Sequence, residues 1–207
     1  MDNGKIYVFL TDCDYNAQAV TLSPKERDDE VKATKNPRLR MEKQGVWRLL
    51  TLALNELCYD VNAIKPYKAE NGKWCSDSLY FSLSHSDSLL GVAISTEPCG
   101  IDIENTQSMI ERYSDPNRLK GFYEKIRTGT ENADPSGEAL ISLWTAKESI
   151  YKMRGVGDFL PARIDTNEHN VAHKSWQSEG RDYHISVSSD NPVLNKDKDI
   201  IYKYVKM

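Results

Sequence analysis

Hydrophobic and polar residues follow strand-like or helix-like periods along most of the chain. Residues 4–11 are mainly apolar, with β-branched and aromatic side chains, which favours a strand. Ser23 followed by Pro24 is typical of a helix start. Residues 38–58 have apolar side chains at the spacing of an amphipathic helix, and we expect this stripe to lie in the core. The stripe consists of Val46, Leu49, Leu50, Ala53, Leu54 and Leu57.

The middle of the chain predicts a group of short antiparallel strands after a turn at Asn71-Gly72. Their apolar runs are separated by short polar segments of the length that hairpins use. The three strands are expected at 78–84, 89–95 and 99–104.

The second half of the chain predicts helices first and strands afterwards. Residues 106–127 and 138–153 have helical spacing, and Gly155 suits the end of the second helix. An exposed loop is expected at 130–137. Because helices and strands are grouped rather than alternating, the predicted fold class is α+β and not a doubly wound parallel sheet. The last strands are expected near 172–177, 182–188 and 199–206.

Composition narrows the class of protein. The chain has 207 residues, of which 39% are hydrophobic, and its mean hydropathy is −0.61, which describes a polar chain that can still bury a core. The 27 Lys and Arg against 31 Asp and Glu give a net charge of −4, which argues against a nucleic-acid partner. No apolar run approaches the roughly 20 residues of a membrane helix.

The N-terminal sequence M-D-N-G-K does not have the pattern of a signal peptide. The four cysteines form no C-x-x-C pair, so we expect reduced thiols in a cytoplasmic protein. His169 and His173 are four residues apart, but they lie in a region of loop and strand without a third candidate ligand. We therefore expect these two histidines to be solvated and not to bind a metal.

Asp102 and Glu104 lie two residues apart in a predicted strand, so their side chains share one face while Ile101 and Ile103 face a core. Carboxylates held together in this way suit Mg²⁺, which prefers oxygen ligands. The same pattern also occurs on ordinary half-exposed strands, and the spacing alone does not separate these alternatives.

A second candidate cluster lies on the predicted helix at 138–153. Trp144, Glu148 and Lys152 fall on one stripe, and Lys147 lies beside Glu148. An exposed Glu148–Lys152 ion pair would stabilise the helix by only about 0.3–0.5 kcal/mol. A tryptophan on the same stripe favours burial of at least part of it.

The segment S-L-S-H-S at 82–86 places hydroxyls and an imidazole at a strand end, which makes it a candidate phosphate site. A serine hydrolase is disfavoured because the G-x-S-x-G motif is absent. The alternative is a polar turn with a solvated histidine.

Taken in order, S-L-S-H-S, G-I-D-I-E and W-T-A-K-E-S-I-Y-K resemble the motifs of the Sfp-type 4′-phosphopantetheinyl transferases over roughly residues 20–165. The resemblance implies transfer of 4′-phosphopantetheine from coenzyme A to a serine of an acyl or peptidyl carrier protein, with Mg²⁺ as cofactor and 3′,5′-ADP as the product released. It also implies a monomer with two similar α+β halves of antiparallel sheets, related by a pseudo-twofold axis. In this family the active site lies in the cleft between the halves, with the coenzyme side in 1–105 and the carrier side in 106–207.

The resemblance implies roles for individual residues. Asp102, Glu104 and Glu148 match the Mg²⁺ ligands, and Glu148, or a water that it orients, matches the base. Lys152 matches a catalytic lysine near the diphosphate. The residues that match contacts to coenzyme A are Ser84, His85, Lys147, Lys152, Lys73 and Arg40.

Two parts of the coenzyme match depart from the family pattern. Trp74 replaces the proline that follows the lysine matched by Lys73. The family often has lysines for the 3′-phosphate after the helix start matched by Ser23-Pro24, and here Lys25 or Arg27 is the candidate substitute in the stretch K-E-R-D-D.

Two other functions are compatible with parts of the sequence. One is a non-catalytic lobe of the same fold that binds coenzyme A or a carrier protein, although the acids and lysines of both signatures are present. The other is a different Mg²⁺-dependent nucleotidyl or phosphoryl transferase, which the absence of a P-loop motif disfavours.

Overall fold

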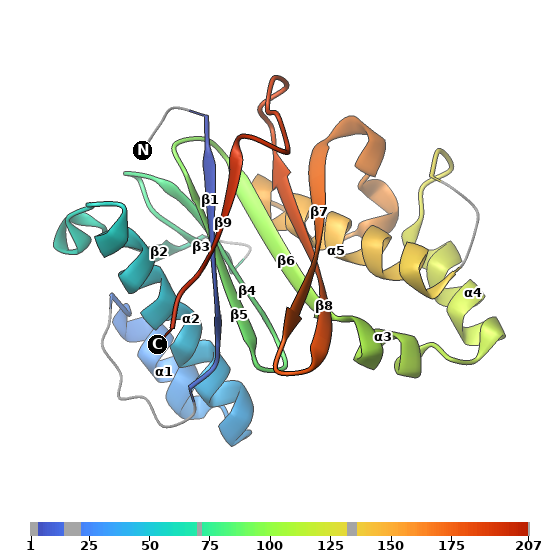
Figure 1. The fold of residues 1–207 in the computed structure, drawn as a ribbon, viewed down its shortest axis with the longest axis horizontal. Coiled ribbons are helices and arrows are strands. Elements are labelled where there is room, and N and C mark those ends of the chain that lie inside the picture. Colours follow the sequence, from blue (N-terminus) through green and yellow to red (C-terminus); the bar gives the residue numbers. More distant parts are fainter. Residues whose placement is uncertain (1–3, 15–21, 70–71, 132–135, 207) are drawn as a thin grey trace.

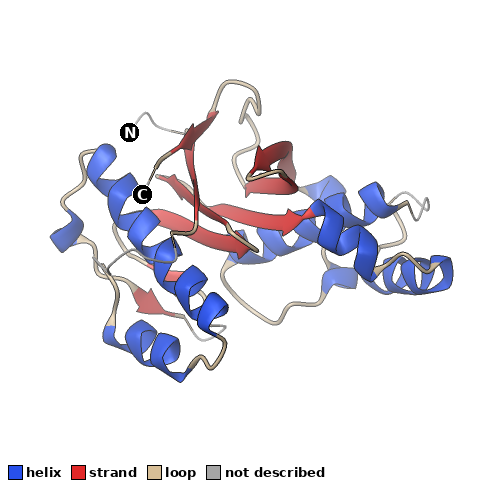
Figure 2. Ribbon diagram, turned by 60° about the horizontal axis from the view of Figure 1, so that its bottom comes forward, coloured by secondary structure: helices blue, strands red, loops and turns tan. Residues whose placement is uncertain are grey.

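The computed structural model describes residues 4–14, 22–69, 72–131 and 136–206 (Figure 1). Its fold is α+β, as predicted, with mainly antiparallel sheets and helices on their outer sides (Figure 2). In these residues no helix has the length and hydropathy that crossing a membrane would require. The four cysteines, all in described segments, form no disulfide with one another.

The first sheet has the strand order β4-β5-β1-β9, in which β9 runs parallel to β1 and the other pairs are antiparallel. The predicted hairpin between the strands at 78–84 and 89–95 is confirmed, because β4 and β5 pair over their whole length. The strands are β1 (Ile6–Asp12), β4 (Tyr80–Ser86), β5 (Leu89–Ser95) and β9 (Ile200–Tyr204).

Helix α2 (Pro37–Glu56) covers one face of this sheet, next to α1 (Lys25–Ala33). Most of the predicted apolar stripe is buried against Phe9, Phe81 and Val92, and Leu57 packs at its edge. Asn36 caps the helix by accepting a hydrogen bond from the N–H of Leu39, and Pro37 occupies the first turn. A short helical turn (Val61–Ala63) and the small hairpin of β2 (Tyr67–Lys68) and β3 (Trp74–Cys75) follow.

The second sheet is antiparallel with the order β6-β8-β7, and helix α5 lies across it. Its strands are β6 (Cys99–Asn105), β7 (Asn170–Ser178) and β8 (Arg181–Ser189). The helices of this part are α3 (Thr106–Arg112), α4 (Pro116–Ile126) and α5 (Gly137–Arg154), with short helical turns at Pro161–Arg163 and Thr166–Glu168. Ile101 and Ile103 lie in a core shared with Ile6, Val8 and Leu10 of β1, as predicted.

Serine side chains join the edges of the two sheets. The hydroxyls of Ser82, Ser84 and Ser86 on β4 accept hydrogen bonds from backbone N–H groups of β6. The donors are Ile101 at 3.1 Å, Ile103 at 3.1 Å and Asn105 at 2.9 Å. Because alternate residues of a strand share one face, the S-x-S-x-S spacing directs all three hydroxyls at the same neighbour. These hydrogen bonds give the three N–H groups acceptors on a strand that does not belong to the sheet of β6.

The structure differs from the sequence predictions at several elements. The predicted hairpin between the strands at 89–95 and 99–104 is wrong, because β6 pairs with β8. The helix predicted over 106–127 is two helices, since Asp115 caps α4 and Pro116 begins it. The loop expected at 130–137 and the turn at Asn71 lie partly outside the described residues.

The sheets do not divide at the boundary predicted between residues 105 and 106. Strand β6 lies before that boundary but belongs to the sheet with β7 and β8. Strand β9 lies after it but pairs in parallel with β1. Each part of the chain therefore contributes a strand to the other part's sheet.

Gly100 allows α5 to lie directly on β6. A Cβ atom at this position would collide with the carbonyl oxygen of Ser149 and would approach the backbone nitrogen of Met153 to 2.8 Å. Both obstacles are backbone atoms of one helix, so they cannot rotate away. We expect Gly100→Ala to destabilise the fold by at least about 1–3 kcal/mol.

The measurement is chemical denaturation, with Gly121→Ala as the matched control. Gly121 lies inside α4, where an added Cβ meets nothing within 4 Å. The control substitution should leave stability unchanged or raise it by up to about 1 kcal/mol. Equal stabilities for the two variants would contradict close packing of α5 on β6.

Candidate active site

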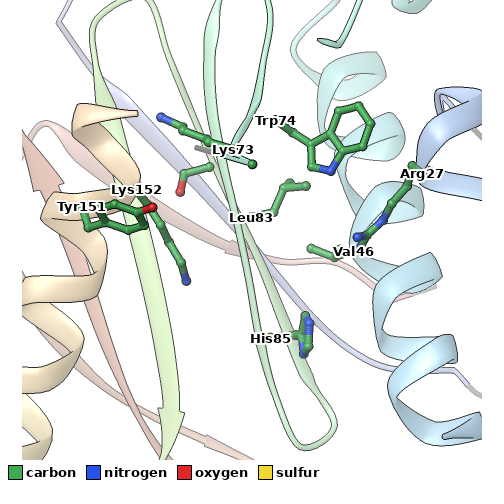
Figure 3. A pocket seen from close by; sticks show the side chains of 10 residues that line it. Arg27, Val46, Lys73, Trp74, Leu83, His85, Tyr151 and Lys152 are labelled. Carbon is green, nitrogen blue, oxygen red and sulfur yellow. The ribbon is translucent and has the colours of Figure 1, made fainter. Parts of the chain in front are cut away.

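A cavity of about 270 Å³ opens between α1, α2, β4 and the C-terminal part of α5 (Figure 3). Four basic side chains line it: Arg27, Lys73, His85 and Lys152. Its apolar lining includes Trp74 and Leu83. Basic groups around an apolar wall are suited to a ligand that has both phosphates and a ring or chain to bury.

Residues from all three sequence motifs meet at the edge of this cavity, where α5 passes over β6. The ammonium group of Lys152 lies 2.5 Å from Asp102 Oδ1 and 3.2 Å from Ser84 Oγ. It also lies 3.6 Å from Glu148 Oε2. The Ser84 hydroxyl donates to Asp102 Oδ1 at 3.0 Å. The Glu148–Lys152 pair is thus part of a larger, half-buried cluster and not an isolated surface pair.

The Ser84 hydroxyl has all its hydrogen-bonding capacity in use. It accepts from the N–H of Ile103 and from Lys152, and it donates to Asp102. A hydroxyl has one donor and two acceptor sites, so no site is left over. Ser84 therefore fixes the position of Lys152 and Asp102 relative to the seam between the sheets.

Burial and the close approach of the acids to one another both shift the pKa values in this cluster. Burial, followed by repulsion from Asp102, raises the pKa of Glu148 to about 7 although Lys152 opposes the shift. Burial and Asp102 also raise the pKa of Glu104, against a hydrogen bond from Ser86. Burial alone would lower the pKa of Lys152, but Asp102 and Glu148 raise it.

The site fits an added cation. Asp102 is 3% exposed, and its Oδ2 atom is buried without a hydrogen-bond partner among the described residues. An unpaired buried carboxylate oxygen costs free energy that a cation would recover. No three His, Cys, Asp or Glu side chains of the described segments are already gathered at metal-binding distances. Asp102, Glu104 and Glu148 share one negative region, in which Lys152 is the cation in contact.

His85 contacts a chain of polar side chains, Glu42, Arg38 and Asp87, that the sequence analysis did not find. Its Nδ1 lies 3.3 Å from Oε2 of Glu42, which is 6% exposed. Arg38 donates to the other oxygen of Glu42 at 3.0 Å and to Asp87 at 3.0 Å. The only sequence signal was the four-residue spacing of Arg38 and Glu42, which is ordinary on a helix surface. The carboxylate of Glu42 orients His85, which lies at the cavity wall (Figure 3).

Lys147 does not lie in the cavity. It is fully buried, and its ammonium donates to Glu131 at 2.8 Å and to the carbonyls of Pro161 and Ile164 at 3.1 and 2.5 Å. Successive residues of a helix point about 100° apart, so Lys147 can turn to Glu131 while the adjacent Glu148 faces Lys152. The expected contact of Lys147 with coenzyme phosphates is therefore not supported, because its three protein partners already surround the charge.

Arg40 and Lys73 were also expected to contact coenzyme A, and only Lys73 lies at the cavity. Arg40 donates twice to the carbonyl of Thr34, at 3.1 and 2.9 Å, and it is not among the described residues that line the cavity. Its guanidinium instead holds the C-terminal end of α1. Lys73 does line the cavity, and burial lowers its pKa. Arg27, one of the two candidate substitutes for the 3′-phosphate lysines, also lines it.

The comparisons with known proteins point to the same family as the G-I-D-I-E and W-T-A-K-E-S-I-Y-K motifs. The family profile described as the 4′-phosphopantetheinyl transferase superfamily matches residues 98–202. The chain is similar to the 4′-phosphopantetheinyl transferase gsp of Aneurinibacillus migulanus, with 33% identity over 105 residues that make up 49% of this chain and 44% of the relative. It is also similar to the 4′-phosphopantetheinyl transferase Sfp of Bacillus subtilis (strain 168), with 31% identity over 108 residues, or 49% and 46% of the two chains. The matched part spans less than half the length of each relative.

The Lys147–Glu131 ion pair joins α5 to the segment that contains Glu131. We expect loss of this pair to destabilise the fold. Burial alone would raise the pKa of Glu131, but hydrogen bonds from Lys147 and from the N–H groups of Thr128 and Thr166 lower it. A depressed folded pKa means that this stabilisation is present above the unfolded pKa of about 4.3 and is lost as the pH falls through the folded value.

Glu131→Gln leaves Lys147 as a buried charge without its counterion, so stability at pH 7 should fall by about 3–5 kcal/mol. The deficit relative to the wild type should shrink below about pH 4. Denaturant titrations at several pH values measure both effects. Glu124→Gln, which breaks the exposed pair with Lys120, is the control and should change stability by less than about 0.5 kcal/mol. A deficit no larger than that of the control would contradict the role given to the pair.

Proposed function

The chain belongs to the 4′-phosphopantetheinyl transferase superfamily, and on that basis we propose that it transfers 4′-phosphopantetheine from coenzyme A to a serine hydroxyl of an acyl or peptidyl carrier protein. The proposed co-product is 3′,5′-ADP, and the proposed cofactor is Mg²⁺. The observation that supports this most is the meeting of Ser84, Asp102, Glu148 and Lys152 beside a cavity lined by basic side chains.

The main difficulty of such a reaction is charge. A diphosphate repels a nucleophile, and the leaving group departs as an anion, so preorganised positive charge lowers the barrier. Lys152, His85 and Lys73 are the groups that we propose to bind the phosphates of coenzyme A, with Arg27 as the candidate for the 3′-phosphate. Ser84 acts by positioning Lys152.

Asp102, Glu104 and Glu148 are the residues that we propose to hold Mg²⁺. When bound, the ion would supply Lewis-acid stabilisation of the diphosphate charge. The unpaired Oδ2 of Asp102 supports this assignment, and so do the raised pKa values of Glu104 and Glu148. The two pKa shifts come first from burial and then from repulsion by Asp102, and a bound cation would offset that repulsion.

Glu148 is the proposed base, directly or through a water that it orients. A general base works best with a pKa near the working pH, and without a bound metal ion, burial with repulsion from Asp102 raises the pKa of Glu148 to about 7. A bound Mg²⁺ would lower this pKa, which favours a water that Glu148 orients as the immediate proton acceptor. The carrier serine would transfer its proton to this carboxylate or to the oriented water as its oxygen attacks the β-phosphorus. Lys152 then remains protonated and faces the developing negative charge.

We also propose the architecture that the family resemblance implies: two similar halves around a cleft, in a monomer. The cavity beside β4 and α2 would be the coenzyme side, and the face of α3, α4 and α5 the carrier side. The exchange of β6 and β9 between the two sheets would make the halves interdependent, so we do not expect either half to fold alone.

Intact-mass analysis of an apo carrier protein incubated with coenzyme A, Mg²⁺ and this protein tests the proposal. We expect the mass of the carrier to increase by one phosphopantetheine, and the increase to disappear when Mg²⁺ is chelated. Coenzyme A binding without a mass gain on acyl and peptidyl carriers would instead support a non-catalytic binding lobe.

Substitution of Glu148 tests the base assignment in the same assay. Glu148→Gln should lower the turnover rate by about 10²–10⁴-fold while coenzyme A binding is retained. Glu138→Gln, at an exposed position in the first turn of α5, is the control and should leave turnover unchanged. If Glu148→Gln binds coenzyme A and Mg²⁺ normally and keeps full turnover, Glu148 is not the base.

A further inference from the structure

Two histidines from different strands meet on the second sheet. His173 of β7 lies opposite Ser186 of β8, and His184 of β8 lies opposite Ser175 of β7. Directly opposite residues share a face, so the two imidazoles are diagonal neighbours on one face of the sheet. The pairing was not visible in the sequence, where the notable spacing is that of His169 and His173.

The ring nitrogens of this pair are at the separation that a shared metal ion requires. Nδ1 of His173 lies 3.1 Å from Nε2 of His184. Imidazole nitrogens bind zinc-like ions at about 2.0–2.1 Å, so two of them on a tetrahedral ion are roughly 3.3 Å apart. The rings are tilted by 48° with centroids 5.3 Å apart, so they are not stacked face to face. The observed N–N separation is within a few tenths of an ångström of that value.

His173 Nδ1 lies within hydrogen-bonding distance of more polar groups than one ring nitrogen can bond to. Besides His184, the hydroxyls of Ser186 and Ser142 lie 3.0 and 3.4 Å from it. One ring nitrogen has either a single proton or a single lone pair, so it can make only one of these hydrogen bonds well. A cation between the two imidazoles would use both lone pairs, and the two hydroxyls could then turn to other partners or to metal-bound water.

Both imidazoles are available in the neutral form that binds metals. Partial desolvation, followed by repulsion from His184, lowers the pKa of His173 to about 4 although the residue keeps exposed surface, and burial lowers that of the half-buried His184. Metal entry at neutral pH therefore needs only that each ring holds its proton on the nitrogen away from the pair. His173 is exposed and His184 is half-buried, so an ion can reach them from solvent.

The donor set indicates the class of metal. Imidazole nitrogens suit late first-row transition ions, whereas Mg²⁺ prefers oxygen ligands. No third His, Cys, Asp or Glu of the described residues completes the set, so water would fill the remaining positions. The site therefore differs in chemistry from the carboxylates of Asp102 and Glu104, although these lie on the same face of the sheet.

We propose that His173 and His184 form an open two-imidazole site that binds a late first-row divalent transition metal ion such as Ni²⁺ or Zn²⁺. The two strands hold the ligands in place before the ion arrives, because their backbone ladder fixes the register. The site does not depend on the transferase activity proposed above.

Isothermal titration of the full chain with Ni²⁺, in excess Mg²⁺, tests the site. We expect one Ni²⁺ per chain at this site, with Co²⁺ bound more weakly, as the order of these ions predicts. His173→Ala and His184→Ala should each weaken Ni²⁺ binding by at least about 10-fold. His173→Gln, which keeps a polar side chain of similar size, should show the same loss.

His169→Ala is the matched control, because His169 instead contacts Arg154 and pairs with Asp190. It should leave the affinity for Ni²⁺ unchanged within about twofold, and thermal unfolding should show all variants folded. The proposal is overturned if His173→Gln or His184→Ala keeps wild-type affinity. It is equally overturned if excess Mg²⁺ abolishes Ni²⁺ binding, since the ion would then lie at the carboxylates.

Discussion

The row of hydrogen bonds from the serines of β4 to the backbone of β6 is the contact on which the site depends. Two sheets meet edge to edge here, and the edge of β6 would leave buried N–H groups without acceptors if the serines were absent. Each such bond contributes only about 1 kcal/mol net, but an unsatisfied buried N–H costs about 1–3 kcal/mol. The three together therefore favour one register of β4 against β6.

That register explains why the two faces of β4 have different functions. Ser84 points at β6, where it meets Asp102 and Lys152, while the neighbouring His85 points toward α2 and Glu42. A strand places successive side chains on opposite faces, so one short motif reaches both the acid cluster and the cavity. Gly100 completes the arrangement, because it lets α5 bring Glu148 and Lys152 down onto the same seam.

The net charge of −4 is a sum over regions of the protein that differ in local charge. The acids at the seam exceed the single ammonium of Lys152 in contact with them, whereas the adjoining cavity is lined by Arg27, Lys73 and His85. A negative region beside a basic cavity is an arrangement that suits a divalent cation together with a phosphate-rich ligand. Charge counted over the whole chain cannot show this separation.

Local patterns predicted the local parts of this structure. The apolar stripe of α2, the β4–β5 hairpin and the shared face of Asp102 and Glu104 all follow from period and spacing within a few residues. Partners that are distant in sequence were not predictable in this way. A period of two shows that 99–105 is a strand, but it does not say whether its partner is β5 or β8. For the same reason the sequence could not show that Lys147 turns to Glu131, that Glu42 holds His85, or that His173 meets His184.

The central claim is that serine side chains fix β4 against β6, and amide hydrogen exchange at Ile103 tests it most directly. The account predicts that the N–H of Ile103 exchanges as slowly as core amides in the wild type. In Ser84→Ala its protection should fall, while Ile185, which is hydrogen-bonded within the β6–β8–β7 sheet, should keep its protection. An Ile103 amide that exchanges rapidly in the wild type, or equally slowly in both proteins, would contradict the account.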